Sequence, residues 1–292
     1  MNILVLGATG MLGSMVYDVL KSSSKFKVVG TARKKKSDFI LLDANQNLKD
    51  LKSILKGYNF VINCIGITKP YCHDDNVEEV ENAININSLF PYKLDKIAKD
   101  NGFKVIQIAT DCVYCGREGK YKEDAPHDAL DVYGKTKSLG EVHSKTFLNI
   151  RSSIIGPEKY TKVFLLEWFL KQPAGAILNG FTNHFWNGVT TLQFAELCLF
   201  IIEKDKFDSL NKVSSIHNFV PNEVISKYQL LSTFKKVFGN DVTINKQKGG
   251  KERIDRTLDT KYNSISSFFP NSNIKIELEK LMPYINKRVI NV

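Results

Sequence analysis

The chain has 292 residues, of which 43% are hydrophobic, 25% charged and 11% aromatic, and its formal net charge is +10 at pH 7. This composition is typical of a folded chain with one large domain or two lobes, and it excludes a disordered tail, a collagen-like chain and a small disulfide-stapled scaffold. No apolar run approaches the roughly 18 residues that a membrane helix needs, and neither a basic segment nor a cleavage site at the N-terminus indicates a secretory signal. We therefore expect a cytoplasmic protein with no membrane partner.

The positive charge does not by itself indicate a nucleic-acid partner. The lysines are spread along the chain, with one short basic run at 33–36, and no RNA- or DNA-binding motif is present. A basic surface also suits an enzyme whose ligands carry several phosphates. Cys112 and Cys115 form a C-x-x-C pair, but no second pair and no histidine at ligand spacing accompanies them. We expect reduced thiols and no metal site.

Up to residue 110, apolar runs alternate with helical patterns. The predicted strands are Ile3–Leu6, Phe26–Gly30, Phe39–Leu42, Phe60–Ile65 and Phe103–Ala109, and the predicted helices are Met11–Lys21, Leu48–Lys56 and Val80–Asp100, with a kink or break at Pro91. Short apolar strands joined by helical crossovers predict a doubly wound parallel sheet of the α/β class.

The second half of the chain is less regular. We predict a helix over Glu158–Lys171, a helix that begins near Thr190 with a capping box to Gln193, and a helix from Ser226 to Gly239. A late strand over His217–Val220 would return to the main sheet. This pattern predicts two interleaved lobes: residues 1–150 with about 188–220 form a dinucleotide-binding domain, and residues 151–187 with 221–292 form a smaller substrate lobe.

A glycine-rich turn follows the first strand and opens the first helix. The residues are Gly7, Ala8, Thr9, Gly10, Met11, Leu12 and Gly13. Glycines at this junction let the backbone approach a pyrophosphate, which then lies at the positive end of the helix. The turn therefore predicts a dinucleotide cofactor.

The residues after the next three strands indicate which dinucleotide is bound and which parts of it they would contact. NAD-binding folds usually carry an acidic residue after the second strand, whereas this chain has Arg33 and Lys34 there. Cations suit a 2′-phosphate, so NADPH is favoured and NADH stays open. Asp43, with Ala44, would meet the adenine amino group, and the segment Cys64, Ile65 and Gly66 would pass beneath the ribose or pyrophosphate.

A tyrosine and a lysine four residues apart share one helix face at Tyr133 and Lys137. The amine is expected to lower the pKa of the phenol and make it a usable proton donor. The same spacing occurs at Tyr17/Lys21 and Tyr92/Lys96, but only Tyr133 follows a strand that ends in a hydroxyl residue, Thr110. Thr110, Tyr133 and Lys137 can converge on one carbonyl oxygen.

These motifs resemble the extended short-chain dehydrogenase/reductases, and within them the sugar-nucleotide reductases that act on dTDP-4-dehydrorhamnose. The likeness lies in the blocks 109–116, 119–126 and 133–141, with support from Asn85-Ile-Asn87, Arg151 and Asn187. It implies that Thr110 orients the substrate carbonyl, Tyr133 protonates its oxygen, and Lys137 holds the nicotinamide ribose. It also implies a nucleotide-sugar substrate bound by the later half of the chain, and it is compatible with a homodimer.

The resemblance implies an NADPH-dependent reductase of a nucleotide-activated 4-keto-6-deoxy sugar, in polysaccharide biosynthesis. Related dehydratases carry an Asp-Glu pair after the threonine, whereas Asp111 is followed here by Cys112. An NAD-dependent 4-epimerase and a non-catalytic NADP-sensing regulator stay open as alternatives. The expected substrate residues are Asp111, Arg151, His184, Trp186 and Asn187.

Overall fold

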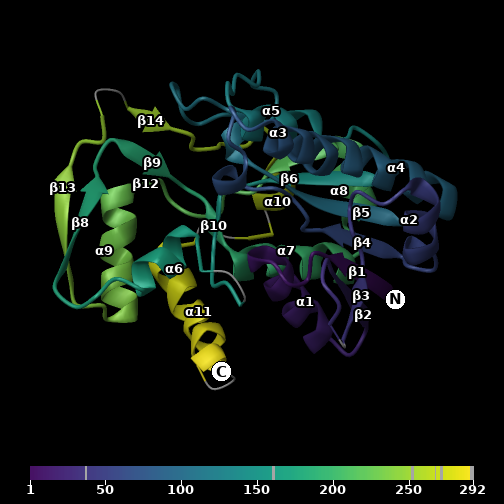
Figure 1. Cartoon of the computed structure of the whole chain (residues 1–292), viewed down its shortest axis with the longest axis horizontal. Helices are drawn as coiled ribbons and strands as arrows, with labels where there is room; N and C mark the ends of the chain where they lie inside the picture. Colours follow the sequence, from purple (N-terminus) through teal and green to yellow (C-terminus); the bar gives the residue numbers. More distant parts are fainter. Residues whose placement is uncertain (37, 160–161, 251–252, 267, 270–271, 290–292) are drawn as a thin grey trace.

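The computed structural model describes residues 1–36, 38–159, 162–250, 253–266, 268–269 and 272–289. Its centre is a parallel sheet of seven strands in the order β11-β6-β5-β4-β1-β2-β3 (Figure 1). The strands are β1 (Asn2–Leu6), β2 (Lys27–Ala32), β3 (Phe39–Leu41), β4 (Phe60–Asn63), β5 (Lys104–Ala109), β6 (Phe147–Arg151) and β11 (Ile216–Asn218). The predicted doubly wound parallel sheet is confirmed, and so is a late strand that returns to its edge.

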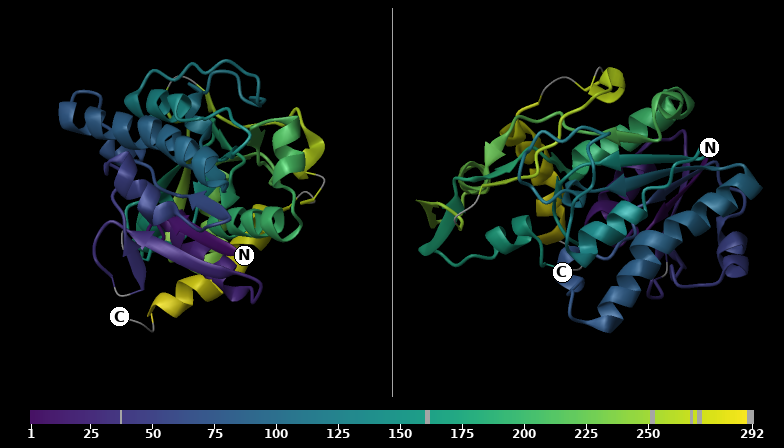
Figure 2. Two further views of the ribbon diagram at one scale, coloured as in Figure 1. Left: turned by 90° about the vertical axis from the view of Figure 1, so that its right-hand side faces the viewer. Right: turned by 90° about the horizontal axis from the view of Figure 1, so that it is seen from above.

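Helices cover both faces of this sheet (Figures 1 and 2). On one face α1 (Met11–Ser22) packs against α7 (Thr191–Glu203), and their apolar residues share one core cluster. On the other face α2 (Leu48–Leu55) packs against α4 (Phe90–Asn101) over a second cluster. The helix α8 (Phe207–Val213) lies against β6. Because both faces are covered, the central strands are nearly continuous apolar runs.

The predicted long helix before β5 is interrupted close to Pro91. It consists of α3 (Val77–Ala83), the π-helical turn η2 (Ile84–Leu89) and α4, and Pro91 lies in the first turn of α4. Proline lacks an N–H and cannot continue the hydrogen-bond ladder of the preceding turn. The helical backbone nevertheless continues through η2 into α4, so the irregularity expected at Pro91 takes the form of a π-turn just before it, which places Asn87 and Ser88 in buried positions.

The remaining elements form a smaller unit beside the main sheet, to its left in Figure 1. They include two parallel pairs, β7 (Ile154–Ile155) with β10 (Val189–Thr190) and β8 (Ala176–Phe181) with β13 (Val242–Gln247). A three-stranded sheet consists of β12 (Ile225–Ser226), β9 (His184–Trp186) and β14 (Ile254–Asp255). The helices here are α6 (Leu165–Leu170), α9 (Lys227–Phe238) and α11 (Ile274–Val289), whereas α10 (Asn263–Ser266) lies against α8 beside the main sheet.

Two predicted helix starts in the later half are confirmed and one is wrong. Capping boxes begin α7 at Thr190 and α9 at Ser226, and α9 ends at Gly239. The helix predicted over Glu158–Lys171 is shorter than expected: only α6 forms, and it begins at Leu165. The Glu158 carboxylate accepts the backbone N–H groups of Val163 and Phe164, so the chain just before α6 is bonded to a side chain and is not helical. Residues 160–161 lie outside the described residues.

The part of the chain described above contains no helix with the length and apolar surface needed to cross a membrane.

Candidate functional site

The glycine-rich turn links β1 to the N-terminus of α1. Gly7 has a left-handed backbone (φ 72°), and its N–H donates to the Thr31 hydroxyl at 3.1 Å. The Gly10 N–H bonds the Gly7 carbonyl at 2.9 Å, which closes the turn. No acidic side chain lies in the first turn of α1. The exposed backbone at Gly10 and the helix terminus therefore fit the pyrophosphate of a dinucleotide.

The other predicted cofactor residues lie at the same edge of the sheet, because the strands are parallel. Arg33 is exposed directly after β2, Asp43 follows β3, and Cys64, Ile65 and Gly66 follow β4. Thr9 and Met11 are half-buried beside Gly10, whereas the side chains of Leu12 and Ala44 belong to the two core clusters. Leu12 and Ala44 can therefore meet a cofactor only through their backbone.

Asn87 in the π-turn fixes the segment after β4. Its amide oxygen accepts the Ile67 N–H at 2.8 Å, and its amide nitrogen donates to the Ile67 carbonyl at 3.0 Å and to the Thr136 hydroxyl at 3.2 Å. A Cβ placed on Gly66 would lie 3.3 Å from the Asn87 oxygen and 3.9 Å from Lys137 Nζ. Asn87 therefore joins the predicted cofactor segment to the helix that carries Lys137, a role that the sequence motif alone did not show.

Thr110 and Tyr133 meet at the end of β5. Tyr133 lies in the first turn of α5 (Val132–Leu139), which Asp131 caps by accepting the Gly134 N–H at 2.7 Å. A Cβ on Gly134 would lie only 2.4 Å from the Cys112 carbonyl oxygen, so glycine is what lets α5 approach this turn. This approach places Tyr133 beside the turn that begins at Thr110, whose hydroxyl accepts the Cys112 N–H at 3.1 Å.

Lys137 lies one turn further along α5 and is buried. Its Nζ donates to the Ile108 carbonyl at 3.0 Å, and burial lowers its pKa to about 8, an effect that the charges of Glu141 and Cys64 oppose. The expected lowering of the Tyr133 pKa by Lys137 is wrong for this structure. Burial instead raises the pKa of Tyr133 far above its usual range, so the phenol holds its proton at neutral pH.

Beside this pair, Asp111 faces two cations that no motif predicted. Asp111 is buried, and its carboxylate accepts the Thr110 hydroxyl at 3.2 Å. Burial raises the pKa of Asp111, whereas the charges of Arg256 and Lys227 oppose that rise. Lys227 begins α9 and its Nζ lies 5.7 Å from the centre of the Trp186 ring, while Arg256 follows β14 and donates to the Tyr114 carbonyl at 2.9 Å. The smaller unit thus contributes two cations to the end of β5.

Arg151 does not have the free guanidinium that a substrate contact requires. It is 1% exposed, and its five N–H donors are all engaged by protein groups: Nε and Nη2 bind Glu141, Nη1 binds Tyr114 and Glu123, and Nη2 also binds His127. This placement contradicts the expected substrate contact of Arg151.

The other three expected substrate residues pack within the smaller unit. His184 stacks on Phe181 and contacts the Gly249 carbonyl at 3.3 Å. Trp186 is buried and its indole N–H donates to the Ser153 hydroxyl at 2.9 Å. The contact of its ring with Lys227 is what connects Trp186 to the site. The Asn187 amide makes two hydrogen bonds to the backbone of Leu258. Asn187 therefore fixes the loop that carries Arg256. His184, Trp186 and Asn187 therefore support neighbouring segments of the protein at these positions.

All five cysteines are free thiols. Cys112 lies beside Asp111, and burial raises its pKa to about 12, which disfavours the thiolate. Cys115 donates to the Asp128 carboxylate at 2.7 Å. Among the described residues, no three His, Cys, Asp or Glu side chains gather as metal ligands would.

A parallel sheet, a glycine turn at its first strand and a Thr-Tyr-Lys set at the end of β5 define the class of extended short-chain dehydrogenase/reductases. Residues 1–241 match the family model of the RmlD substrate-binding domain, and the chain belongs to that family.

Relatives of known name are similar in sequence, and a solved structure is similar in fold. Methionine adenosyltransferase 2 subunit beta from Xenopus tropicalis is 27% identical over 251 residues, which cover 80% of this chain and 71% of that protein. The dTDP-4-dehydrorhamnose reductase from Aggregatibacter actinomycetemcomitans is 31% identical over 144 residues, 48% of this chain and 45% of that enzyme. The structure of dTDP-4-dehydrorhamnose reductase from Bacillus anthracis, in complex with NADP, has a TM-score of 0.78 at 15% identity and covers 97% of this chain and 99% of that one.

Proposed function

We propose that this protein is a cytoplasmic NADPH-dependent reductase of a nucleotide-activated 4-keto-6-deoxy sugar. The observation that carries the proposal is the close approach of α5, which carries Tyr133 and Lys137 on one face, to the turn that begins at Thr110 at the end of β5. A protonated phenol at this position is arranged to deliver a proton to a carbonyl oxygen. NADPH, when bound, supplies the hydride that completes a net reduction.

Within this proposal each residue of the set has a separate task. Thr110 orients the sugar carbonyl, Tyr133 gives its proton to the carbonyl oxygen, and Lys137 binds the nicotinamide ribose. The high pKa of Tyr133 keeps the proton on the phenol until the oxygen becomes basic. Asp111, followed by Cys112, supplies one carboxylate where an elimination of water would need an acid and a base.

Lys227 and Arg256 suit the diphosphate of a nucleotide sugar. Both lie close enough to influence the Asp111 carboxyl, and Lys227 is half-buried at the N-terminus of α9, where desolvation lowers its pKa. A diphosphate would offset the cost of burying these charges through charge-assisted hydrogen bonds. We therefore place the diphosphate between α9 and the segment after β14, with the sugar directed toward Tyr133.

Arg33 should set the preference for NADPH. Replacing Arg33 with alanine is expected to raise the Kd for NADPH by about 10- to 100-fold, because a charge-assisted hydrogen bond to the 2′-phosphate contributes about 1.5–3 kcal/mol. The Kd for NADH, which lacks that phosphate, should change little and serves as the internal control. Fluorescence titration with both cofactors measures the effect, and an equal loss for both would contradict this role of Arg33.

The reductase proposal is tested by following NADPH consumption with a panel of dTDP-, UDP-, GDP- and CDP-linked 4-keto-6-deoxy sugars. Turnover with a member of the panel supports a reductase and identifies the nucleotide. A 4-epimerase would use the same tyrosine and lysine without net consumption of NADPH. Tight NADPH binding with no oxidation by any sugar nucleotide would overturn the reductase proposal.

The second candidate is a non-catalytic regulatory subunit that binds NADP. It is favoured by the similarity to methionine adenosyltransferase 2 subunit beta, which extends over 80% of the chain. The two functions differ in what Tyr133 does, because a regulator has no need of a proton donor. Substitution of Tyr133 therefore separates them.

A further inference from the structure

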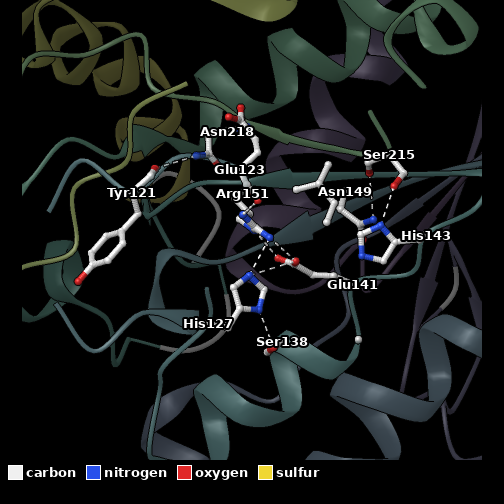
Figure 3. Close-up of polar contacts among 12 residues, drawn as sticks. Tyr121, Glu123, His127, Ser138, Glu141, His143, Asn149, Arg151, Ser215 and Asn218 are labelled. Carbon is white, nitrogen blue, oxygen red and sulfur yellow. Dashed lines mark hydrogen bonds and ion pairs between the residues drawn. The ribbon is translucent and has the colours of Figure 1, made fainter. Parts of the chain in front are cut away.

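Arg151 on β6 is the centre of a buried hydrogen-bond network that reaches α5 (Figure 3). Its Nε and Nη2 bond the two carboxylate oxygens of Glu141 at 2.7 and 2.6 Å, and its Nη1 bonds the Tyr114 hydroxyl and the Glu123 carbonyl at 2.9 and 3.1 Å. A guanidinium has five N–H donors, and these contacts use four of them. The remaining donor, the second N–H of Nη2, meets Nε2 of His127 at 2.8 Å.

This last contact fixes the protonation state of the His127 ring. Arg151 stays charged at physiological pH and can only donate, so Nε2 of His127 carries no proton and accepts. The proton of the neutral ring then lies on Nδ1, which donates to the Ser138 hydroxyl at 2.6 Å (Figure 3). Neutral His127 therefore links Arg151 to the last turn of α5, where Ser138 directly follows Lys137.

The last turn of α5 depends on contacts from other elements. The helix has eight residues, and a helix of that length gains little stability from its own hydrogen bonds. Ser88 in the π-turn donates to the Thr136 carbonyl at 2.8 Å, and Gln107 on β5 donates to the Gly140 carbonyl, just beyond the helix, at 2.8 Å. His127 adds a contact from the loop before α5. Of these three contacts, only that of His127 involves a group that titrates near neutral pH.

A proton on Nε2 of His127 would place two N–H donors opposite each other. The Nη2 donor of Arg151 would lose its acceptor inside the protein, and two positive charges would lie in contact. Both effects disfavour the charged ring. Burial lowers the pKa of His127, and the charge of Arg151 lowers it further. The unfolded chain therefore takes up this proton more readily than the folded one, and falling pH acts against the network.

Four other groups that carry charge or titrate face the His127 ring. Glu141, after α5, lies 3.7 Å from Nε2 and favours the charged ring, but its Oε2 already accepts a guanidinium N–H at 2.6 Å. Asp128, the next residue of the loop, also favours the charged ring, and His143 opposes it. The Tyr114 ring meets the imidazole edge-on at 5.4 Å between ring centres, and burial raises the phenol pKa to about 12, so it is uncharged. The pKa of His127 lies below its ordinary value when all of these groups act together.

We propose that His127 is a positioning residue, which holds the last turn of α5 through Ser138 while its ring is neutral and releases this turn when Nε2 takes up a proton. The proposal rests on the proposed function for its catalytic meaning, because α5 carries Tyr133 and Lys137. The network itself can be measured without any turnover.

The first test follows the His127 ring by two-bond ¹H–¹⁵N NMR correlations, assigned through bonds in labelled protein. At neutral pH the ring proton should lie on Nδ1, and the ring should titrate below the pH of an unperturbed histidine. Across that midpoint, the hydrogen-exchange protection of the α5 amides, corrected for the intrinsic pH dependence of exchange, should fall by about 5- to 30-fold, as expected for the loss of a buried hydrogen bond. A neutral ring protonated on Nε2, or a titration without any loss of protection in α5, would overturn the proposal.

His127→Gln removes the titration. A glutamine side chain brings an amide oxygen close to the position of Nε2 and takes up no proton, so the protection of α5 should no longer change in this pH range. His143→Gln is the matched control, because His143 bonds Ser215 at 3.2 Å and lies in the same network, and this variant should keep the step (Figure 3). A step that survives in His127→Gln, or disappears in His143→Gln, would contradict the role of His127. If His127→Gln does not fold, the wild-type measurement decides on its own.

Turnover separates this proposal from the proposed function. In a reductase, the acidic limb of kcat/KM should follow the His127 midpoint and should move to lower pH in His127→Gln. A protein that reduces no sugar nucleotide but shows the Nδ1 proton and the step in α5 would refute the reductase and leave the role of His127 intact. A reductase that shows neither would refute the role of His127 alone.

Discussion

Replacing Tyr133 with phenylalanine should lower kcat by about 10²- to 10⁴-fold, the usual contribution of a positioned general acid. The phenyl ring keeps the packing of α5 against the turn after β5, and only the phenol hydroxyl is lost. NADPH affinity should therefore change little. Steady-state kinetics with a sugar nucleotide from the panel, together with fluorescence titration of NADPH, measures both quantities.

Tyr92→Phe is the matched control for this result. Tyr92 and Lys96 have the same spacing as Tyr133 and Lys137, but Tyr92 is 46% exposed on α4. Its loss should leave kcat close to the wild-type value. If Tyr133→Phe kept its turnover, Tyr133 would not be the proton donor, and if it lost NADPH binding instead, the residue would have a structural role.

Replacing Gly13 with alanine should destabilise the fold and abolish cofactor binding. The added Cβ would lie 2.1 Å from the Gly7 carbonyl oxygen and 2.7 Å from its carbon, and both are backbone atoms that cannot move aside alone. Overpacking of this kind costs about 1–3 kcal/mol or more. Because the clash forces the glycine turn away from α1, the N–H groups that would meet the pyrophosphate separate. Denaturant unfolding and NADPH titration measure the two effects.

Gly10→Ala in the same turn provides the comparison for stability. Its Cβ would meet the Gly7 oxygen at 3.4 Å, an ordinary contact, and its backbone has φ −78°, which alanine adopts freely. The free energy of unfolding should change by only a few tenths of a kcal/mol, as for most unstrained substitutions. Equal losses of stability in Gly10→Ala and Gly13→Ala would contradict the prediction, because the close approach of Gly13 to Gly7 would then not be the cause of the destabilisation.

The sequence predicted those parts of the protein whose signals are local. The apolar runs predicted the strands, a capping box predicted the helix start at Thr190, and Gly239 predicted the end of the helix that begins at Ser226. The glycine turn at Gly7 and the hydroxyl at Thr110 lie at strand ends where parallel sheets collect ligands. Each of these depends on neighbours within a few positions of the chain. The helix expected from Glu158 failed because the Glu158 side chain bonds backbone N–H groups that the helix pattern alone cannot reveal.

The features that the sequence did not predict depend on residues far apart in the chain. The charges of Lys227 and Arg256 act on Asp111 because β9, β12 and β14 form one small sheet that brings α9 and the segment after β14 together, and neither cation lies in a recognisable motif. Arg151 was expected to bind substrate on the basis of the resemblance to the sugar-nucleotide reductases. Its partner Glu141 is ten positions away, and their pairing follows from the approach of α5 to β6, which periodicity does not encode.

The pKa of Tyr133 also could not be predicted from spacing. A lysine four residues along a helix indicates a lowered phenol pKa only where the effect of its charge outweighs the desolvation of the phenol. Here burial acts on Tyr133 and Lys137 in opposite directions, raising the pKa of the phenol and lowering that of the amine. Depth of burial is a property of the assembled fold.

The most direct measurement of the central claim follows a deuterium label from the nicotinamide of NADPH to the sugar. The wild-type protein is incubated with NADPH deuterated at C4 of the reduced ring and with the accepted nucleotide-4-keto-6-deoxy sugar, and the product is analysed by mass spectrometry and NMR. The account predicts one deuterium at C4 of the sugar, with NADP formed in equal amount, and no transfer in Tyr133→Phe. An unlabelled sugar, or turnover that Tyr133→Phe retains, would contradict it.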